Sequence, residues 1–290
     1  MTELSPPLEL KALLTPLELA FYFVVGWTFC GFALSRALKR NDVADLLWGS
    51  GITFLIVSMG FLTGDAPLNP AQWLIMVLVT LWGSRLTLYL AIRNLPEPED
   101  SRYAAWRLEW GKKEPLIALF RVFLLQSVFA VFVAAAGWGG LIDRTPELPL
   151  KGLHVILGFL SLTGLFIEAI ADLQLMHFKS HQDPTHRSVL NTGLWRYSRH
   201  PNYFGEALFW LAITGLSLSV ATNAGWMLLA ALGSSFLTFL LLKVSGVTMT
   251  ERGMRARRKS EDYESYINST SPFIPLPPNL YQRIKQKRTE

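Results

Sequence analysis

The chain has 290 residues, of which 51% are hydrophobic and only 17% are charged, and its formal net charge is +5. This composition is more apolar and less charged than that of an ordinary soluble domain, so it argues against a water-soluble protein and indicates a membrane protein. The single cysteine, Cys30, excludes an intramolecular disulfide framework and a metal site built from cysteines.

Seven apolar stretches are each long enough to cross a bilayer, which takes about 20 residues in a helix. They cover residues 17–35, 44–63, 72–93, 116–140, 152–175, 203–221 and 224–245. We therefore predict an all-α, polytopic membrane protein with seven transmembrane helices. The first stretch has no signal-peptide cleavage site and is expected to stay in the protein. Residues 1–278 are expected to form one membrane domain, followed by a polar C-terminal tail, 279–290.

Lys and Arg gather in alternate loops, at residues 36–43, 93–115 and 176–200 and in the tail from residue 246. Because cytoplasmic loops carry the excess of Lys and Arg, we expect the N-terminus outside and the C-terminus in the cytoplasm. The lipid bilayer is the expected surrounding. The basic charge is a signal of topology, and because no nucleic-acid motif accompanies it, we expect no nucleic-acid partner. No obligate protein partner is evident.

Two carboxylates mark the start of the second apolar stretch. Asp42 is a candidate N-cap, and Asp45 lies one turn inside, where the helix dipole stabilises a negative charge. Capping alone is one interpretation of both residues, and a proton-handling role for Asp45 is the other. In the basic loop that precedes the fourth stretch, residues 103–107 are typical of a short interfacial helix.

The third stretch carries Trp82, Arg85, Tyr89 and Arg93, whose spacing of three and four residues places them on one helix face. An Arg in the middle of an apolar helix needs an anionic partner. Its partner is either a carboxylate of the fifth stretch or a ligand phosphate, which Arg binds in a bidentate manner.

The fifth stretch contains Glu168 and Asp172, and Lys179 follows on the same face. These groups form either an internal salt bridge or the polar wall of a ligand cavity, because carboxylates within a membrane usually face a hydrated site. His177 and His181 are four residues apart, but no third ligand has a matching spacing, so we expect no metal site.

A polar segment, residues 199–206, joins a basic loop to the sixth stretch. Its Asn202 and Glu206 share one helix face at a membrane boundary, where polar groups are costly unless they have a partner or a function. The basic residues of the preceding loop suit a ligand that bears phosphate; they are Lys179, Arg187, Arg196 and Arg199.

The tail between residues 250 and 263 is strongly basic. It is expected either to rest on anionic lipid head groups or to cap an anionic ligand with Arg252 and Tyr263. Neither a P-loop nor a GxGxxG turn after a strand is present, so a dinucleotide would have to be held by side chains.

Together these segments resemble the DUF1295 family, a bacterial branch of the steroid 5α-reductase superfamily, over residues 15–278. The likeness rests on residues 42–49, 85–89, 99–103, 199–206 and 261–263. Reductases of this superfamily are seven-helix proteins that hold NADPH in a cavity open to the cytoplasm and reduce an activated carbon–carbon double bond. The resemblance implies a lipid-metabolic enzyme of the bacterial inner membrane, with its active site open to the cytoplasm and a hydrophobic small-molecule substrate.

The resemblance also implies residue roles. Asp45 and Trp82 are the nearest counterparts of the Glu and Tyr that polarise the substrate carbonyl, and Tyr89 is a third candidate for this catalytic donor. Trp lacks the acidity of a phenol, and the superfamily's Gln-Glu-Leu-Pro segment is absent, which argues against a steroid. The implied NADPH-binding residues are Arg85, Asp172, Lys179, Arg187, Arg199, His200, Asn202, Tyr203, Glu206, Arg252 and Tyr263.

We therefore expect an NADPH-dependent reductase of a lipid-like enone, with Arg85, Asp172, Lys179 and Asn202 around one nucleotide-binding cavity. The alternative is a membrane methyltransferase that uses S-adenosylmethionine, because isoprenylcysteine carboxyl methyltransferases carry a similar Arg-His-Pro-x-Tyr element. A non-enzymatic lipid-binding protein is the third hypothesis, and it leaves the polar residues of the apolar segments unexplained.

Overall fold

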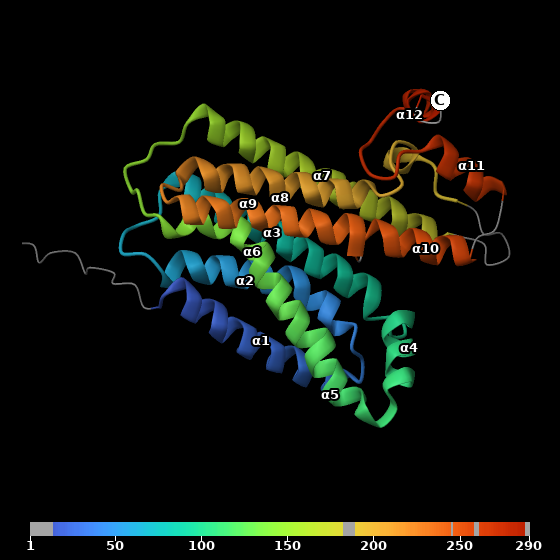
Figure 1. Ribbon diagram of the computed structural model, residues 1–290, viewed down its shortest axis with the longest axis horizontal. Coiled ribbons are helices and arrows are strands. Elements are labelled where there is room, and N and C mark those ends of the chain that lie inside the picture. The colour runs from blue at the N-terminus through green and yellow to red at the C-terminus, as the bar shows by residue number, and fades with distance from the viewer. Residues whose placement is uncertain (1–13, 182–188, 245, 258–260, 288–290) are drawn as a thin grey trace, which may run out of the picture. The chain divides into compact units, whose positions relative to one another are not determined.

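The computed structural model describes residues 14–181, 189–244, 246–257 and 261–287, with the side chains of 255–257 left out. These residues form helices and loops, with one isolated bridge between Ser198 and Ser271 and no strand among them (Figure 1). Seven helical segments of this part of the chain are long and apolar enough to cross a membrane. The predicted all-α fold with seven spanning helices is confirmed, and the orientation of the termini stays a prediction.

The spanning segments follow the predicted windows to within a few residues, except for the fourth and for the seventh, Ala224–Met254, which ends nine residues after its window. The fourth is longer because α4, the short helix expected near residues 103–107, runs on through one 3₁₀ turn and one π-helical turn into α6. The longer helices are α1 (Pro16–Leu38), α2 (Val43–Leu62), α3 (Pro70–Asn94), α6 (Leu125–Ile142), α7 (Gly152–Ser180), α8 (Pro201–Val220) and α9 (Ala224–Phe239). The shorter ones are α4 (Ser101–Trp110), α5 (Glu114–Ala118), α10 (Val247–Arg257), α11 (Glu261–Ser269) and α12 (Pro278–Gln286).

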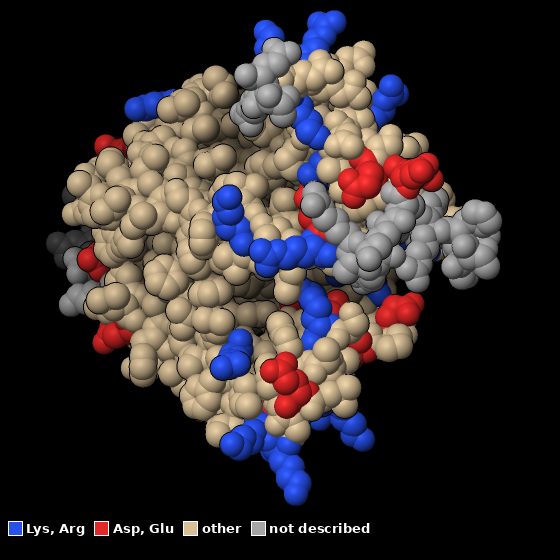
Figure 2. Space-filling model, turned by 45° about the vertical axis from the view of Figure 1, so that its right-hand side comes forward, with Lys and Arg blue, Asp and Glu red and all other residues tan. Residues whose placement is uncertain are grey.

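The surface of the spanning helices is apolar rather than charged. Phe21, Leu88 and Phe159 are 63%, 62% and 68% exposed. Broad areas of the space-filling view bear neither basic nor acidic side chains (Figure 2). Large apolar side chains left uncovered over whole helices are unfavourable in water and favourable against lipid, so these helices suit a bilayer.

Local sequence explains where the helices begin. Thr15 caps α1 in a capping box with Glu18, and Asn69 caps α3 in the same way with Gln72. A proline follows each cap at the first helical position, where a missing N–H costs nothing.

The chain forms two compact units. The first contains the described residues up to Gly158 together with Ile213–Ser234, and the second contains Phe159–Ala212 and the described residues from Ser235 onward. In the first unit α2 packs against α1, α3 and α6. Its Ile52, Leu55 and Met59 are fully buried. The assignment of residues 1–278 to one domain stays a prediction.

In the second unit α7 and α8 approach each other at a pair of glycines. A Cβ atom on Gly205 would lie 2.6 Å from the backbone nitrogen of Glu168 and 2.6 Å from the carbonyl oxygen of Gly164. These atoms belong to the backbone and cannot rotate away, so only glycine permits this contact. The glycine of the 199–206 segment is therefore explained by helix packing, which brings the polar start of α8 against α7.

We predict that Gly205→Ala destabilises the protein by about 1–3 kcal/mol, the usual cost of overpacking a close contact. The measurement is thermal unfolding of the purified protein in detergent. Gly26→Ala in α1 is the matched control, because a Cβ atom there meets no atom within 4 Å. Equal melting temperatures for the two variants would contradict the close α7–α8 contact.

Candidate functional site

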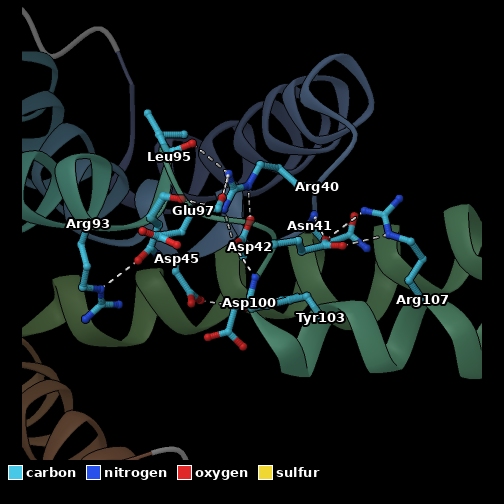
Figure 3. A network of polar contacts seen from close by, with 12 residues as sticks. Arg40, Asn41, Asp42, Asp45, Arg93, Leu95, Glu97, Asp100, Tyr103 and Arg107 are labelled. Atoms are coloured by element: carbon cyan, nitrogen blue, oxygen red, sulfur yellow. Dashed lines mark hydrogen bonds and ion pairs between the residues drawn. The ribbon is translucent and has the colours of Figure 1, made fainter. Parts of the chain in front are cut away.

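A network of ionic and polar side chains joins the loop between α1 and α2 to the loop between α3 and α4 (Figure 3). Arg40 is its centre. Its guanidinium forms a fork on the Asp42 carboxylate, with Nε–Oδ1 at 2.6 Å and Nη2–Oδ2 at 2.7 Å. The same guanidinium donates to the carbonyl oxygens of Asn94 at 3.0 Å and Glu97 at 3.1 Å. One side chain thus fixes two loops that are more than fifty residues apart in sequence.

Asp42 is the carboxylate at the centre of the network. Its carboxylate is 1% exposed and also accepts a hydrogen bond from the backbone N–H of Asp100 at 2.9 Å. Asp42 does occupy the N-cap position of α2, but its side chain makes no capping hydrogen bond. The capping interpretation of this carboxylate is therefore wrong, because the fork with Arg40 and the Asp100 amide use its oxygens.

A second ionic group lies beside the first. Glu114 accepts two hydrogen bonds from Arg36, at 2.6 and 2.9 Å, and one from the Asn41 side chain at 2.7 Å. The Asn41 backbone N–H donates to Glu99, which pairs in turn with Arg107 at 2.9 Å. These pairs tie α1 and α2 to α4 and α5.

The charges of the network stabilise one another. The hydrogen bonds to Asp42 raise the pKa of Arg40 above its ordinary value although burial opposes this. Burial would raise the pKa of Asp100, but hydrogen bonds from the Arg102 side chain and backbone outweigh it and leave this pKa below its ordinary value. Both groups therefore stay charged near neutral pH.

Asp45 lies next to this network and has a partner that the sequence analysis did not assign. The Tyr103 hydroxyl donates to Asp45 Oδ1 at 2.6 Å, and Arg102 Nη2 lies 3.3 Å from Oδ2. Gln126 Nε2 of α6 donates to the Tyr103 oxygen at 3.4 Å. Tyr103 is only 4% exposed. Tyr and Asp side chains can both transfer protons, so Tyr103 joins Asp45 among the candidate catalytic residues.

A pocket opens beside Gln126 in the first unit. It is a partly open hollow, and the roughly 270 Å³ between its walls includes space that is open to the surroundings. Its walls are mostly aromatic and aliphatic, with two polar side chains among them, and they consist of Trp27, Ala44, Leu47, Trp48, Phe123, Gln126, Ser127 and Ala130. An apolar pocket with a few polar groups is the usual form of a small-molecule site.

The other two catalytic candidates lie on α3. Trp82 is fully buried. Tyr89 is partly buried and accepts a hydrogen bond from Arg93 Nη1 at 3.4 Å, while the Arg93 guanidinium lies 5.2 Å from the centre of its ring. The predicted stripe is thus helical as expected, and the catalytic roles of Trp82 and Tyr89 stay predictions.

In the second unit, the polar start of α8 meets α7. Asn202 Nδ2 donates to Asp172 Oδ1 at 3.1 Å, and Asp172 is 5% exposed. The other end of the amide, Oδ1 of Asn202, is buried and accepts no hydrogen bond from the described residues. Glu168 and Glu206 are also buried, at 3% and 8% exposure. Two residues predicted to bind the cofactor are thus in direct contact, and one of them retains an acceptor.

The Arg199 guanidinium forms hydrogen bonds with other residues of the same chain. Its Nε and Nη2 donate to Glu251 Oε1 at 2.9 and 2.6 Å, and its Nη1 donates to the carbonyl oxygens of Ile267 and Thr270. His200 Nε2 lies 3.4 Å from the same Glu251 oxygen. These bonds fasten α10 and α11 to the start of α8, and a cofactor contact of Arg199 stays a prediction.

The remaining cofactor candidates have different surroundings. Tyr203 stacks on the His200 ring at 5.3 Å and lies 3.4 Å from the hydroxyl of Thr250. Tyr263 is 2% exposed in a small apolar cluster. Lys179 and Arg252 are exposed, Arg85 is partly buried, and Arg187 lies outside the described residues.

Two further expectations concern groupings of residues. Arg85 belongs to the first unit, whereas Asp172, Lys179 and Asn202 belong to the second, so their common nucleotide cavity stays a prediction. Among the described residues, no group of three or more His, Cys, Asp or Glu side chains is arranged to hold a metal ion.

Comparison with known proteins places the chain in a family. Residues 31–270 match the family described as "Protein of unknown function (DUF1295)", so the chain belongs to the DUF1295 family. The predicted membership is confirmed. No significant match exists among curated proteins or among solved structures.

We predict that Arg40→Gln lowers the free energy of unfolding by about 3 kcal/mol, because it leaves the buried Asp42 carboxylate without its partner. Lys39→Gln is the matched control, since Lys39 is the neighbouring cation and is exposed. Thermal unfolding and protease cleavage in the 94–100 loop measure the effect. If both variants unfold and are cleaved alike, Arg40 does not hold the loops together.

Proposed function

We propose that this DUF1295 protein is an integral membrane reductase that uses NADPH to reduce an activated carbon–carbon double bond of a lipid-like enone. The observation that carries the proposal is the hydrogen-bonded chain from Gln126 through Tyr103 to Asp45, beside an apolar pocket. In this proposal, the chain supplies a proton donor to an apolar ligand held next to Gln126, the member of the chain that lines the pocket.

The chemistry of an enone requires a donor of this kind. Hydride addition at the β carbon moves an electron pair onto the carbonyl oxygen and produces an enolate, which a proton must then neutralise at the α carbon. A preorganised hydrogen-bond donor at the oxygen is worth about 3–4 kcal/mol in other enzymes. In this proposal, Tyr103 supplies that donor, and the apolar pocket walls exclude water.

Tyr103 has one hydroxyl proton, so its role as donor depends on the protonation state of Asp45. In the structure the single hydroxyl proton of Tyr103 points at Asp45 Oδ1, 2.6 Å away. Tyr103 can donate to a substrate oxygen only if Asp45 first carries a proton and becomes the donor to Tyr103. Asp45 therefore acts as the proton reservoir of the pair, and Gln126 orients the phenol oxygen.

One buried acceptor in the second unit supports the proposal of a bound nucleotide. Asn202 Oδ1 is a buried acceptor that no described residue satisfies, and Asp172 holds the other end of the amide in place. A ligand with N–H or O–H donors would satisfy this oxygen, as the amide and ribose groups of NADPH can. When bound, NADPH supplies the hydride, and the protein supplies position and electrostatic field.

The identity of the cofactor tests the proposal directly. The protein is purified in detergent, and the bound small molecules are identified by mass spectrometry and by the ultraviolet absorbance of reduced nicotinamide. Bound NADPH supports a reductase. Bound S-adenosylmethionine contradicts it and supports the methyltransferase alternative.

We predict that Asn202→Ala raises the Kd for NADPH about tenfold, which corresponds to the loss of about 1.4 kcal/mol. Quenching of tryptophan fluorescence by NADPH measures the affinity. Asn191→Ala is the matched control, because Asn191 is an exposed asparagine of the same unit. Unchanged affinity in Asn202→Ala would exclude this residue from the nucleotide site.

We predict that Tyr103→Phe lowers kcat for enone reduction by about 10²–10³-fold, the cost of removing one oxyanion donor, while the Kd for NADPH is unchanged. NADPH oxidation is followed with a panel of apolar cyclic enones. Tyr22→Phe, a tyrosine on the exposed face of α1, is the control. A wild-type kcat in Tyr103→Phe would remove this residue from the chemistry.

A further inference from the structure

The last described helix, α12 (Pro278–Gln286), has a stripe of apolar side chains that the rest of the described chain leaves partly exposed. Leu280 is 44% exposed and Ile284 is 38% exposed, and Tyr281 adjoins them on the same face. In a helix with about 100° between successive residues, these three positions span roughly 100°. The stripe is therefore continuous along the helix.

Basic side chains flank this stripe. Arg283 follows one edge and Lys285 the other, and Lys287 extends the first edge just beyond the helix. The sequence from Pro278 to Lys287 contains no Asp or Glu. All three cations are exposed, and Lys285 also donates to Asn268 of α11 at 2.7 Å. Arg283 and Lys287 form no ion pair with another residue that the structure describes. Gln282 and Asn279 occupy the opposite, polar face.

The segment before α12 is fastened to the beginning of a membrane-spanning helix. Leu276 N–H donates to the carbonyl oxygen of Tyr197 at 2.9 Å, and Ser198 Oγ donates to the carbonyl oxygen of Phe273 at 2.7 Å. The Phe273 ring contacts Phe204 in the first turn of α8, with 5.8 Å between ring centres. Since α8 is apolar enough to span a bilayer, its first turn lies near the boundary between lipid and water. Two residues after Leu276, α12 begins close to the segment that leads into α8 (Figure 1).

We propose that α12 lies in the plane of the membrane surface and docks on anionic phospholipids. The apolar stripe enters the region between head groups and acyl chains, and Arg283 and Lys287 contact phosphate. An amphipathic helix with cations beside its apolar stripe has the arrangement that surface-bound helices use, because the long basic side chains reach the head groups while their stems stay in lipid. Anionic head groups are the occupant that matches the charge.

The test uses the full chain in lipid nanodiscs. Cys30→Ser removes the single cysteine, and an environment-sensitive fluorophore is attached at Ile284→Cys or, as the matched control on the polar face, at Gln282→Cys. Discs contain phosphatidylcholine alone or phosphatidylcholine with phosphatidylglycerol. We expect a blue-shifted emission from position 284 that is larger in the anionic discs, and a water-like emission from position 282 in both.

A charge variant completes the test. Arg283→Gln with Lys287→Gln should lower the ratio of inserted to water-exposed label at position 284 by roughly tenfold or more in anionic discs, and added salt should do the same to the parent. The melting temperature is expected to stay unchanged, which separates loss of docking from unfolding. Equal emission from positions 284 and 282, or the same shift at 284 in neutral and anionic discs, would overturn the proposal.

Discussion

The fork between Arg40 and Asp42 is the interaction on which the first unit depends. It occurs where α1 ends and α2 begins, and the guanidinium also donates to the carbonyl oxygens of Asn94, the last residue of α3, and of Glu97 in the loop that follows. Apolar packing between the spanning helices does little to set the path of the loops, because lipid is as apolar as the helix surfaces. A buried charge pair with two loop carbonyls and a loop N–H as further partners sets that path. By fixing the loop before α4, it holds Tyr103 where the phenol meets Asp45.

The network contributes more to the positions of the loops than to the free energy of unfolding. A buried ion pair contributes little net free energy, because desolvation offsets much of the attraction between the charges. Removing one partner nevertheless lowers the stability of the fold, because the other charge stays buried without a partner. Few other residues could therefore replace Arg40 at this position. The second unit has a similar arrangement, in which an arginine binds both a carboxylate and backbone carbonyl oxygens. Arg199, at 9% exposure, joins Glu251 and the end of α11 to the start of α8. In each unit, an arginine near a helix end orders the groups next to the candidate chemistry.

The elements of the fold follow from local sequence, whereas the partners of the functional groups do not. Apolar length predicts the seven spans, and the capping boxes at Thr15 and Asn69 mark helix starts without reference to the rest of the chain. Spacing of four places Asn202 and Glu206 on one face of α8. The contact of Asn202 with Asp172 joins α8 to α7 across thirty residues, and the two helices approach each other closely at Gly164 and Gly205. Local spacing contains no information about such a contact.

Tyr103 is a second residue whose partner cannot be predicted from local sequence. Residues 99–103 are among the segments that resemble the family, but the sequence alone assigns Tyr103 no role, because its partner, Asp45, lies 58 residues earlier. For Asp42, local sequence predicts a helix cap because it shows the start of α2 but not the distant groups that bind the carboxylate. A carboxylate before a helix is a cap by default, and only the approach of Arg40 and the Asp100 amide shows that its oxygens are used elsewhere.

The most direct measurement is an experimental structure of the protein with NADPH and an apolar cyclic enone bound. The account predicts that the enone oxygen lies within hydrogen-bonding distance, about 2.6–3.2 Å, of the Tyr103 hydroxyl oxygen, with the apolar part against Trp27 and Trp48. An enone bound away from Tyr103, with the Tyr103–Asp45 hydrogen bond unchanged, would contradict it.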